Sequence, residues 1–170
     1  KNKPWIILTS IGICTNFFNG FRYAVAAYIF QYCMGGDITV GSLIINYTVF
    51  MAFGEVTCMI FGGVSPKFTA WVGSKRMAFI LSSIVCLVLS VAFFFVPMTP
   101  SSIWIMITLV VLTSVGVGIF SPLLWSMYAD VADYATETFG TSSTGLIFSA
   151  GTMAQKFGGA VSGSLIALLL

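Results

Sequence analysis

Apolar residues are gathered into long runs, and this arrangement limits the fold of the chain more than any other feature of the sequence. We expect membrane-spanning segments at residues 5–34, 40–64, 77–96, 103–133 and 145–170. Each run can cross the ~30 Å hydrocarbon core of a bilayer as a helix, which needs roughly 20 residues. The strands of a membrane barrel would instead alternate polar and apolar residues in segments of about ten. The sequence therefore predicts an all-α membrane protein.

Composition agrees with this prediction and argues against several functions. Hydrophobic residues make up 58% of the chain and charged residues 7%, whereas a soluble domain carries about a quarter charged residues. The net charge of +2 is dispersed, so no basic patch is available to bind nucleic acid. The chain has no histidine and no CxxC pair among its four cysteines. We therefore expect no enzyme activity, no cofactor, no metal site and no nucleic-acid partner.

Basic residues indicate the orientation of the runs. They precede the first run and lie between the second and third: Lys1, Lys3, Lys67, Lys75 and Arg76. The connections 35–39 and 97–102 carry no Lys or Arg. Because cytoplasmic connections carry an excess of Lys and Arg, we expect the N-terminal end and the 65–76 connection in the cytoplasm. By parity, the acidic connection that follows Asp130 lies there too.

Three ionisable residues lie well inside runs: Arg22, Glu55 and Lys156. Such residues are rare, usually face inward and commonly mark substrate or ion pathways. Lys156 is the most informative, because a helix that starts at Gly145 places it roughly 16 Å along its axis, near the middle of the bilayer. We expect all three to be functional, and the alternative is a buried ion pair that holds helices together. Glu55 could pair with either cation.

Other side chains are candidates for a substrate cavity. Asn16, Asn19 and Arg22 recur at three residues, so they share one helical face that must line protein or water. Trp125 and Tyr128 could stack on a sugar ring, or could be aromatic residues of the membrane interface. Gln155 could hydrogen-bond a substrate hydroxyl or a neighbouring helix.

Asp130 and Asp133 are spaced i, i+3 and point the same way from a helix end. The helix macrodipole disfavours negative charge at a C-terminus by about 0.3–1 kcal/mol, so we expect cations nearby. Lys75 and Arg76 lie on the same predicted side of the membrane. The acidic pair either forms a cytoplasmic gate of ion pairs or is simply solvated at the interface.

The sequence resembles the glycoside-pentoside-hexuronide cation symporters, the melibiose permease group of the major facilitator superfamily. The stretch SPLLWSMYADVADYATETFGTSSTGLIFSAGTMAQKFGGAVSGSL resembles the tenth and eleventh spans of that family. NKPWIIL and FRYAVAAYIFQYCMG resemble its seventh span, and SPKFTAWVGSKRMAF its connection between the eighth and ninth spans. The resemblance implies two six-helix halves around a central cavity that works by alternating access. We expect this chain to be a C-terminal half without its last helix.

The resemblance also implies roles for particular residues. Lys156 matches the lysine of the eleventh span and would face the cavity, and Arg22 matches an arginine of the seventh span. Asp130 and Asp133 match the ADxxDY signature of the cytoplasmic gate region. The chain departs from the family pattern in the following loop, where Glu, Lys and Arg are common and this sequence has Thr136, Thr138 and Ser142. It also has Glu55 where a neutral polar residue is usual.

The predicted function is cation-coupled sugar symport as part of a multi-pass plasma membrane protein, in a bacterial inner membrane. The expected partners are a sugar, membrane lipid and the missing N-terminal half, which would hold the coupling cation, Na⁺, Li⁺ or H⁺. One alternative is a major facilitator carrier of a non-sugar solute. Others are a structural or sensory membrane subunit without a transport cycle and, more distantly, an intramembrane enzyme.

The asymmetry of Lys and Arg predicts that the first run begins inside and ends outside, with Lys3 in the cytoplasm and Asp37 exterior. A single cysteine at position 37, in a cysteine-free background, should react with an impermeant thiol reagent in intact cells. A cysteine at position 3 should react only after lysis. Labelling of position 37 only after lysis would overturn this topology.

Overall fold

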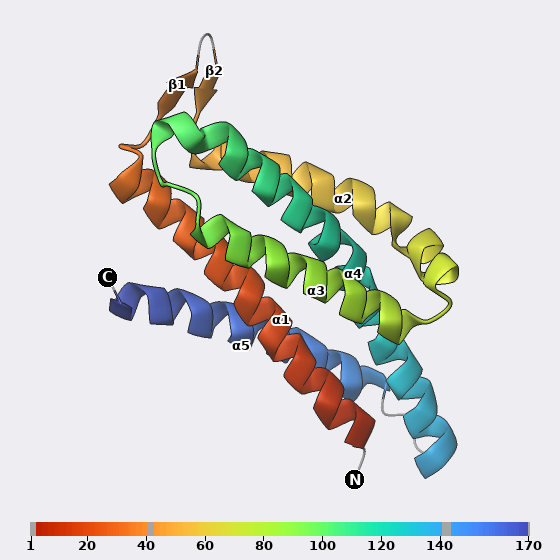
Figure 1. Ribbon diagram of the computed structural model, residues 1–170. Helices are drawn as coiled ribbons and strands as arrows, with labels where there is room; N and C mark the ends of the chain where they lie inside the picture. The colour runs from red at the N-terminus through yellow and green to blue at the C-terminus, as the bar shows by residue number, and fades with distance from the viewer. Residues whose placement is uncertain (1–2, 41–42, 141–143, 170) are drawn as a thin grey trace. The chain divides into compact units, whose positions relative to one another are not determined.

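The computed structural model describes residues 3–40, 43–140 and 144–169, and the predicted loop position Ser142 lies outside the described residues. Helices dominate the described chain (Figure 1): α1 Lys3–Tyr28, α2 Tyr47–Val72, α3 Lys75–Phe94, α4 Ile103–Phe139 and α5 Thr144–Leu169. A π-helical turn, η1 (Ile29–Cys33), extends α1, and a short 3₁₀ turn, η2 (Pro100–Ser102), precedes α4. Two short strands, β1 (Ile38–Val40) and β2 (Leu43–Ile45), form a hairpin. The predicted all-α class is confirmed.

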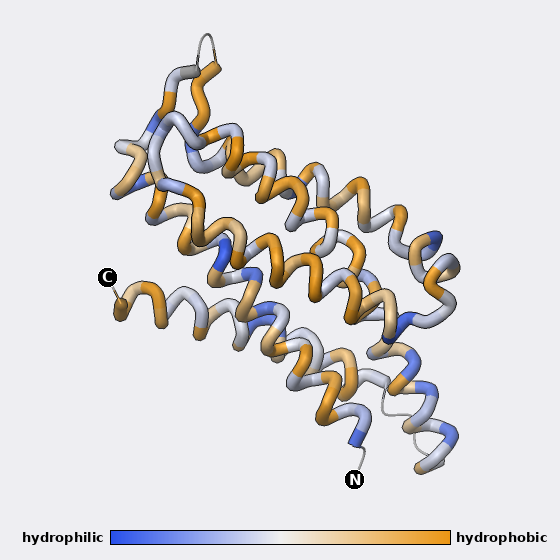
Figure 2. The backbone as a smooth tube through the Cα atoms, in the orientation of Figure 1, coloured by the Kyte–Doolittle hydropathy of each residue, from blue (hydrophilic) through white to orange (hydrophobic). Residues whose placement is uncertain are grey.

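Within the described residues, three helical segments are long and apolar enough to cross a membrane: α2, α3 and Pro100–Phe139. The chain is therefore a membrane protein. Helices α1 and α5 have 26 residues each, but polar residues lower their hydropathy, and Figure 2 shows hydrophilic residues in the middle of α1. Five spans remain a prediction.

The helix that corresponds to the second predicted run, 40–64, begins later and ends later than the run. Ile38 pairs with Ile45 in the hairpin, and α2 begins only at Tyr47. The Asn46 side chain accepts a hydrogen bond from the Val49 N–H at 3.0 Å, as an N-cap does. This cap satisfies a backbone donor of the first turn and fixes the start of the helix.

At its other end, α2 continues through Pro66 to Val72 instead of stopping at Ser65 and Pro66. Proline removes one backbone donor, a loss that membrane helices tolerate where neighbouring helices and Ser or Thr side chains compensate. Here the adjacent Ser65 hydroxyl donates to the Ile119 carbonyl oxygen of α4 at 2.9 Å, which holds this part of α2 against its neighbour. Gly73, in the left-handed conformation, ends the helix.

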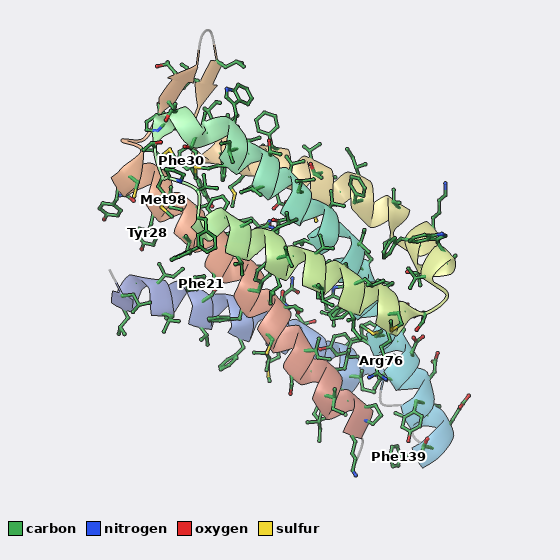
Figure 3. All side chains as sticks on the ribbon, in the orientation of Figure 1. Phe21, Tyr28, Phe30, Arg76, Met98 and Phe139 are labelled. Atoms are coloured by element: carbon green, nitrogen blue, oxygen red, sulfur yellow. The ribbon has the colours of Figure 1, made fainter. Side chains whose placement is uncertain are left out.

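The helix extends beyond the fourth predicted run, 103–133. Helix α4 continues to Phe139, whose side chain is labelled near the helix end in Figure 3. Thr136 lies within this extension, and its hydroxyl donates to the Ala132 carbonyl oxygen at 3.0 Å. Gly140 has a φ of +66° and donates its N–H to the Thr136 carbonyl oxygen, so the glycine terminates the helix. Part of the predicted loop is thus helical.

The chain divides into two compact units: unit 1 comprises Lys1–Val25 and Leu124–Leu170, and unit 2 comprises Ala26–Leu123. In unit 2, α4 is the central helix. In its most apolar stretch 61% of the residues are buried, compared with 22% in the corresponding stretch of α2 and 17% in that of α3. A Cβ on Gly118 would lie 2.6 Å from the Cys58 carbonyl oxygen of α2. The contact between α2 and α4 therefore depends on the absence of a side chain there.

In unit 1, α1 and α5 also approach each other through glycine. A Cβ on Gly158 would lie 2.7 Å from the Ile13 carbonyl oxygen and 2.8 Å from the Phe17 nitrogen. A Cβ on Gly20 would collide with the Ser162 hydroxyl. Small residues at helix contacts let membrane helices approach closely. The close approach increases van der Waals packing, which is one of the forces that drive helix association in lipid.

We predict that Gly158→Ala destabilises the full-length protein, because the new methyl group would meet backbone atoms of α1 that cannot move independently. Overpacking of this kind costs about 1–3 kcal/mol. Gly159→Ala is the matched control, since a Cβ there meets no atom within 4 Å. The thermal unfolding midpoint in detergent should fall for Gly158→Ala only. Equal midpoints in the two variants would contradict this packing.

Candidate functional site

Helix α5 has a packed face of mostly small residues and an exposed face that holds Lys156. The buried positions recur every three or four residues: Ile147, Gly151, Ala154, Gly158, Ser162 and Ile166. Lys156 is two residues from both Ala154 and Gly158, a rotation of about 200°, so it lies on the opposite side of the helix. Its side chain is exposed in the described chain. The packing of α5 therefore directs this charge away from its neighbouring helices.

Lys156 shares its face with a set of side chains that line an open surface hollow of about 630 Å³: Ser149, Thr152, Met153, Lys156 and Phe157. The Ser149 hydroxyl donates to the Gly145 carbonyl oxygen at 2.7 Å, and the Thr152 hydroxyl to the Phe148 carbonyl oxygen at 3.0 Å. Each hydroxyl oxygen can still accept a hydrogen bond, while the Lys156 ammonium carries three donors. The hollow thus offers acceptors, donors and an aromatic ring to a ligand.

Ser149 and Thr152 line the hollow with Lys156 but were not predicted as site residues. Their spacing of seven and four residues before Lys156 is the signal that could have found them, because residues at these spacings share a helical face. Gln155, which was predicted for the cavity, is exposed but does not line this hollow.

The three residues of the predicted polar face of α1, Asn16, Asn19 and Arg22, make different contacts. The Asn16 amide donates to the Gly12 carbonyl oxygen at 2.8 Å, and its Cβ lies where α1 meets Gly158. The Asn19 Oδ1 atom is buried and has no hydrogen-bond partner in the described chain. The Arg22 guanidinium carbon lies 5.5 Å from the centroid of the Tyr23 ring, a cation–π distance. Asn16 therefore serves packing, whereas Asn19 holds an unused acceptor.

The structure places Tyr128 in the packed core of unit 1. It is 1% exposed, its hydroxyl donates to the Leu8 carbonyl oxygen at 3.3 Å, and Gly12 and Gly151 make room for its ring. Trp125 stacks on Phe148 with the ring centroids 6.2 Å apart and the planes at 4°. The structure supports a packing role for Tyr128 rather than stacking on a sugar, because its ring is already covered.

The predicted gate residues are exposed or partly exposed. Asp130 and Asp133 are exposed on α4 in unit 1, but the helix continues for more than a turn beyond them to Phe139, so their predicted position at a helix C-terminus is wrong. Lys75 and Arg76 begin α3 in unit 2, where Figure 3 labels Arg76. Glu55 is exposed on α2, also in unit 2. Their pairing with residues of unit 1 therefore stays a prediction.

The apolar helices and the glycine contacts define a helical membrane protein, and α5 carries a lysine on its exposed face. A family described as "MFS/sugar transport protein" matches residues 1–170, so the chain belongs to this family and to the major facilitator superfamily. Membership of a carrier family points to a role without catalysis. The predicted superfamily is confirmed.

A similar protein is the "Uncharacterized 29.9 kDa protein in crtE 3'region" of Pseudescherichia vulneris. It is 29% identical over 121 residues, which cover 71% of this chain and 43% of that protein. The chain thus spans less than half the length of this relative. No solved structure matches the chain significantly.

We predict that Tyr128→Phe lowers stability and leaves transport by the full-length protein unchanged. The substitution keeps the buried ring and removes the hydrogen bond to Leu8, which costs about 0.5–1.5 kcal/mol. Thermal unfolding in detergent measures the first effect, and the KM for uptake measures the second. A raised KM with an unchanged unfolding midpoint would show that the hydroxyl binds substrate instead.

Proposed function

We propose that this chain is most of the C-terminal half of a cation-coupled sugar symporter of the melibiose permease group, in a bacterial inner membrane. In this proposal the exposed face of α5 lines the sugar path, and the N-terminal half supplies the coupling-cation site. The observation that carries the proposal is the position of Lys156, opposite the packed face of α5 and beside two hydroxyl groups.

The position of Lys156 argues against contact with lipid. Placing a charged side chain near the bilayer centre costs about 2.5–3.5 kcal/mol in insertion experiments. Simulations of an isolated helix give a much larger cost. A lysine this far from both ends of a 26-residue helix must therefore face water or protein. Because the packed face of α5 already contacts its own unit, the exposed face is available to a wet cavity.

The chemistry of this face suits a sugar. A pyranose ring carries several hydroxyl groups, each of which donates one hydrogen bond and accepts others. Ser149 and Thr152 supply acceptor oxygens, Lys156 supplies donors, and the Phe157 ring supplies an apolar surface.

The acidic stretch of α4 fits a cytoplasmic gate in this proposal. Asp130 and Asp133 are exposed and carry like charge on one side of the helix. Lys75 and Arg76 would supply the cations that such an arrangement needs, since both belong to a predicted cytoplasmic connection. Thr136 and Thr138 leave the end of α4 without further cations, so the gate would depend on the connection between α2 and α3.

We predict that Lys156→Ala lowers sugar uptake by the full-length protein roughly tenfold to 100-fold, as expected for the loss of a charged hydrogen bond. Stability should stay near normal, because the side chain is exposed. Lys67→Ala is the matched control, since Lys67 is an exposed lysine outside this face. Uptake is measured with labelled methyl pyranosides of glucose, galactose, xylose and glucuronic acid, with Na⁺, Li⁺ and H⁺ varied.

The double variant Lys156→Ala, Glu55→Ala separates cavity lining from ion pairing. If Lys156 pairs with Glu55 and the pair is buried in the full-length protein, the single change leaves the Glu55 carboxylate without its partner at a cost of about 3–5 kcal/mol, and the double change restores stability. Recovery of stability in the double variant would contradict the cavity role. Normal uptake and stability in Lys156→Ala would contradict both roles, and no uptake of any pyranoside by the wild type would contradict sugar transport.

A further inference from the structure

Two tyrosines form a stacked pair where α1 gives way to the π-helical turn η1. The rings of Tyr28 and Tyr32 have centroids 5.9 Å apart and planes at 16°. Tyr32 is 69% exposed, and Tyr28 is half-buried beneath it. Figure 3 labels Tyr28 at the end of α1 from which the chain enters the hairpin. The Tyr32 ring thus lies nearly parallel to Tyr28 and keeps an open face.

The backbone fixes this pair in place. The Met34 N–H donates to the Ile29 carbonyl oxygen at 3.0 Å, a bond across five residues that closes the wide π turn. On the inner side of the turn, Phe30 is 2% exposed and its ring lies 5.0 Å from that of Phe50 of α2. With Phe30 anchored in unit 2, the tyrosine pair on the outer side of the turn is a preformed surface. Short π turns of this kind are frequent at functional sites.

We propose that Tyr28, Tyr32 and the neighbouring exposed Gln31 bind the ring of a pyranoside at the exterior end of α1, before the sugar reaches the α5 face. This inference rests on the proposed function and on the predicted exterior position of Asp37. The open face of Tyr32 carries partial negative charge and attracts the C–H groups on one side of a sugar ring. The tyrosine hydroxyls and the Gln31 amide then bind sugar hydroxyls.

The three side chains carry no net charge, so this surface offers no ion pair to a charged ligand. Tyrosines also anchor helices at the membrane interface, and the test must separate that role from sugar binding. Trp104 is the matched control, because it is 51% exposed in the first turn of α4, on the same predicted side of the membrane. Removing the ring of a sugar-binding residue should raise KM, whereas removing the ring of a membrane anchor should leave KM unchanged.

The test measures initial uptake by the full-length protein against the external concentration of whichever methyl pyranoside the wild type transports. Tyr32→Leu keeps an apolar side chain and removes the ring, so KM should rise about threefold to tenfold with Vmax unchanged. Tyr32→Phe keeps the ring and should change KM by less than about twofold. Trp104→Leu should leave KM unchanged.

A second measurement follows binding without transport. Cys33 is exposed beside Tyr32, so a variant that keeps only this cysteine reports on the surface. The same methyl pyranoside should slow alkylation of Cys33 by an impermeant maleimide, and Tyr32→Leu should abolish this protection. An unchanged KM in Tyr32→Leu, or an equal rise in Trp104→Leu, would overturn the site while leaving sugar transport intact. A wild type that transports no pyranoside would overturn both.

Discussion

Close backbone approach between helices is the constraint on which the rest of this structure depends. Apolar side chains gain little by leaving lipid for a helix contact, so membrane helices associate through van der Waals packing and hydrogen bonds between small residues. In unit 2, the contact of Gly118 with α2 is supported by the Ser65 hydroxyl, which donates to the Ile119 carbonyl oxygen at 2.9 Å. In unit 1, Gly158 brings α5 against the backbone of α1. Neither contact would survive a larger side chain unchanged.

This packing also decides which polar residues are available for function. On α5, the small residues occupy one face, so Lys156 is placed on the other with Ser149 and Thr152. On α1, Asn16 is used locally, whereas Asn19 keeps an acceptor without a partner in the described chain. The candidate site is therefore a consequence of how the helices pack, and not a separate element added to them.

The sequence allowed much of the fold to be predicted, and the errors have physical causes. The hairpin was missed because Val40 and Leu43–Ile45 are as apolar as a membrane helix, and only the cap at Asn46 distinguishes them from α2. The second predicted run ends just before Ser65 and Pro66, whereas α2 continues through Pro66 and is held by contacts with α4 that one sequence does not reveal. The fourth apolar run ends at Asp133 because polar residues follow it, whereas Gly140 is the residue that ends α4.

The candidate site was predictable to a similar degree. Lys156 was identified from its depth alone, because a single charge inside an apolar run is unusual whatever surrounds it. Tyr128 could not be assigned in the same way, since a tyrosine in a membrane helix suits a cavity, an interface or a core. Its burial between Gly12 and Gly151 depends on contacts between segments far apart in the sequence.

The hydropathy of the helices adds one argument that α1 and α5 line the proposed substrate cavity. Helices α2 and α3 are apolar enough to face lipid and expose large apolar side chains such as Met59 and Leu87. Helices α1 and α5 fall short of that hydropathy because they carry Asn19, Arg22 and Lys156, so these two helices have the stronger need for protein or water at their exposed faces.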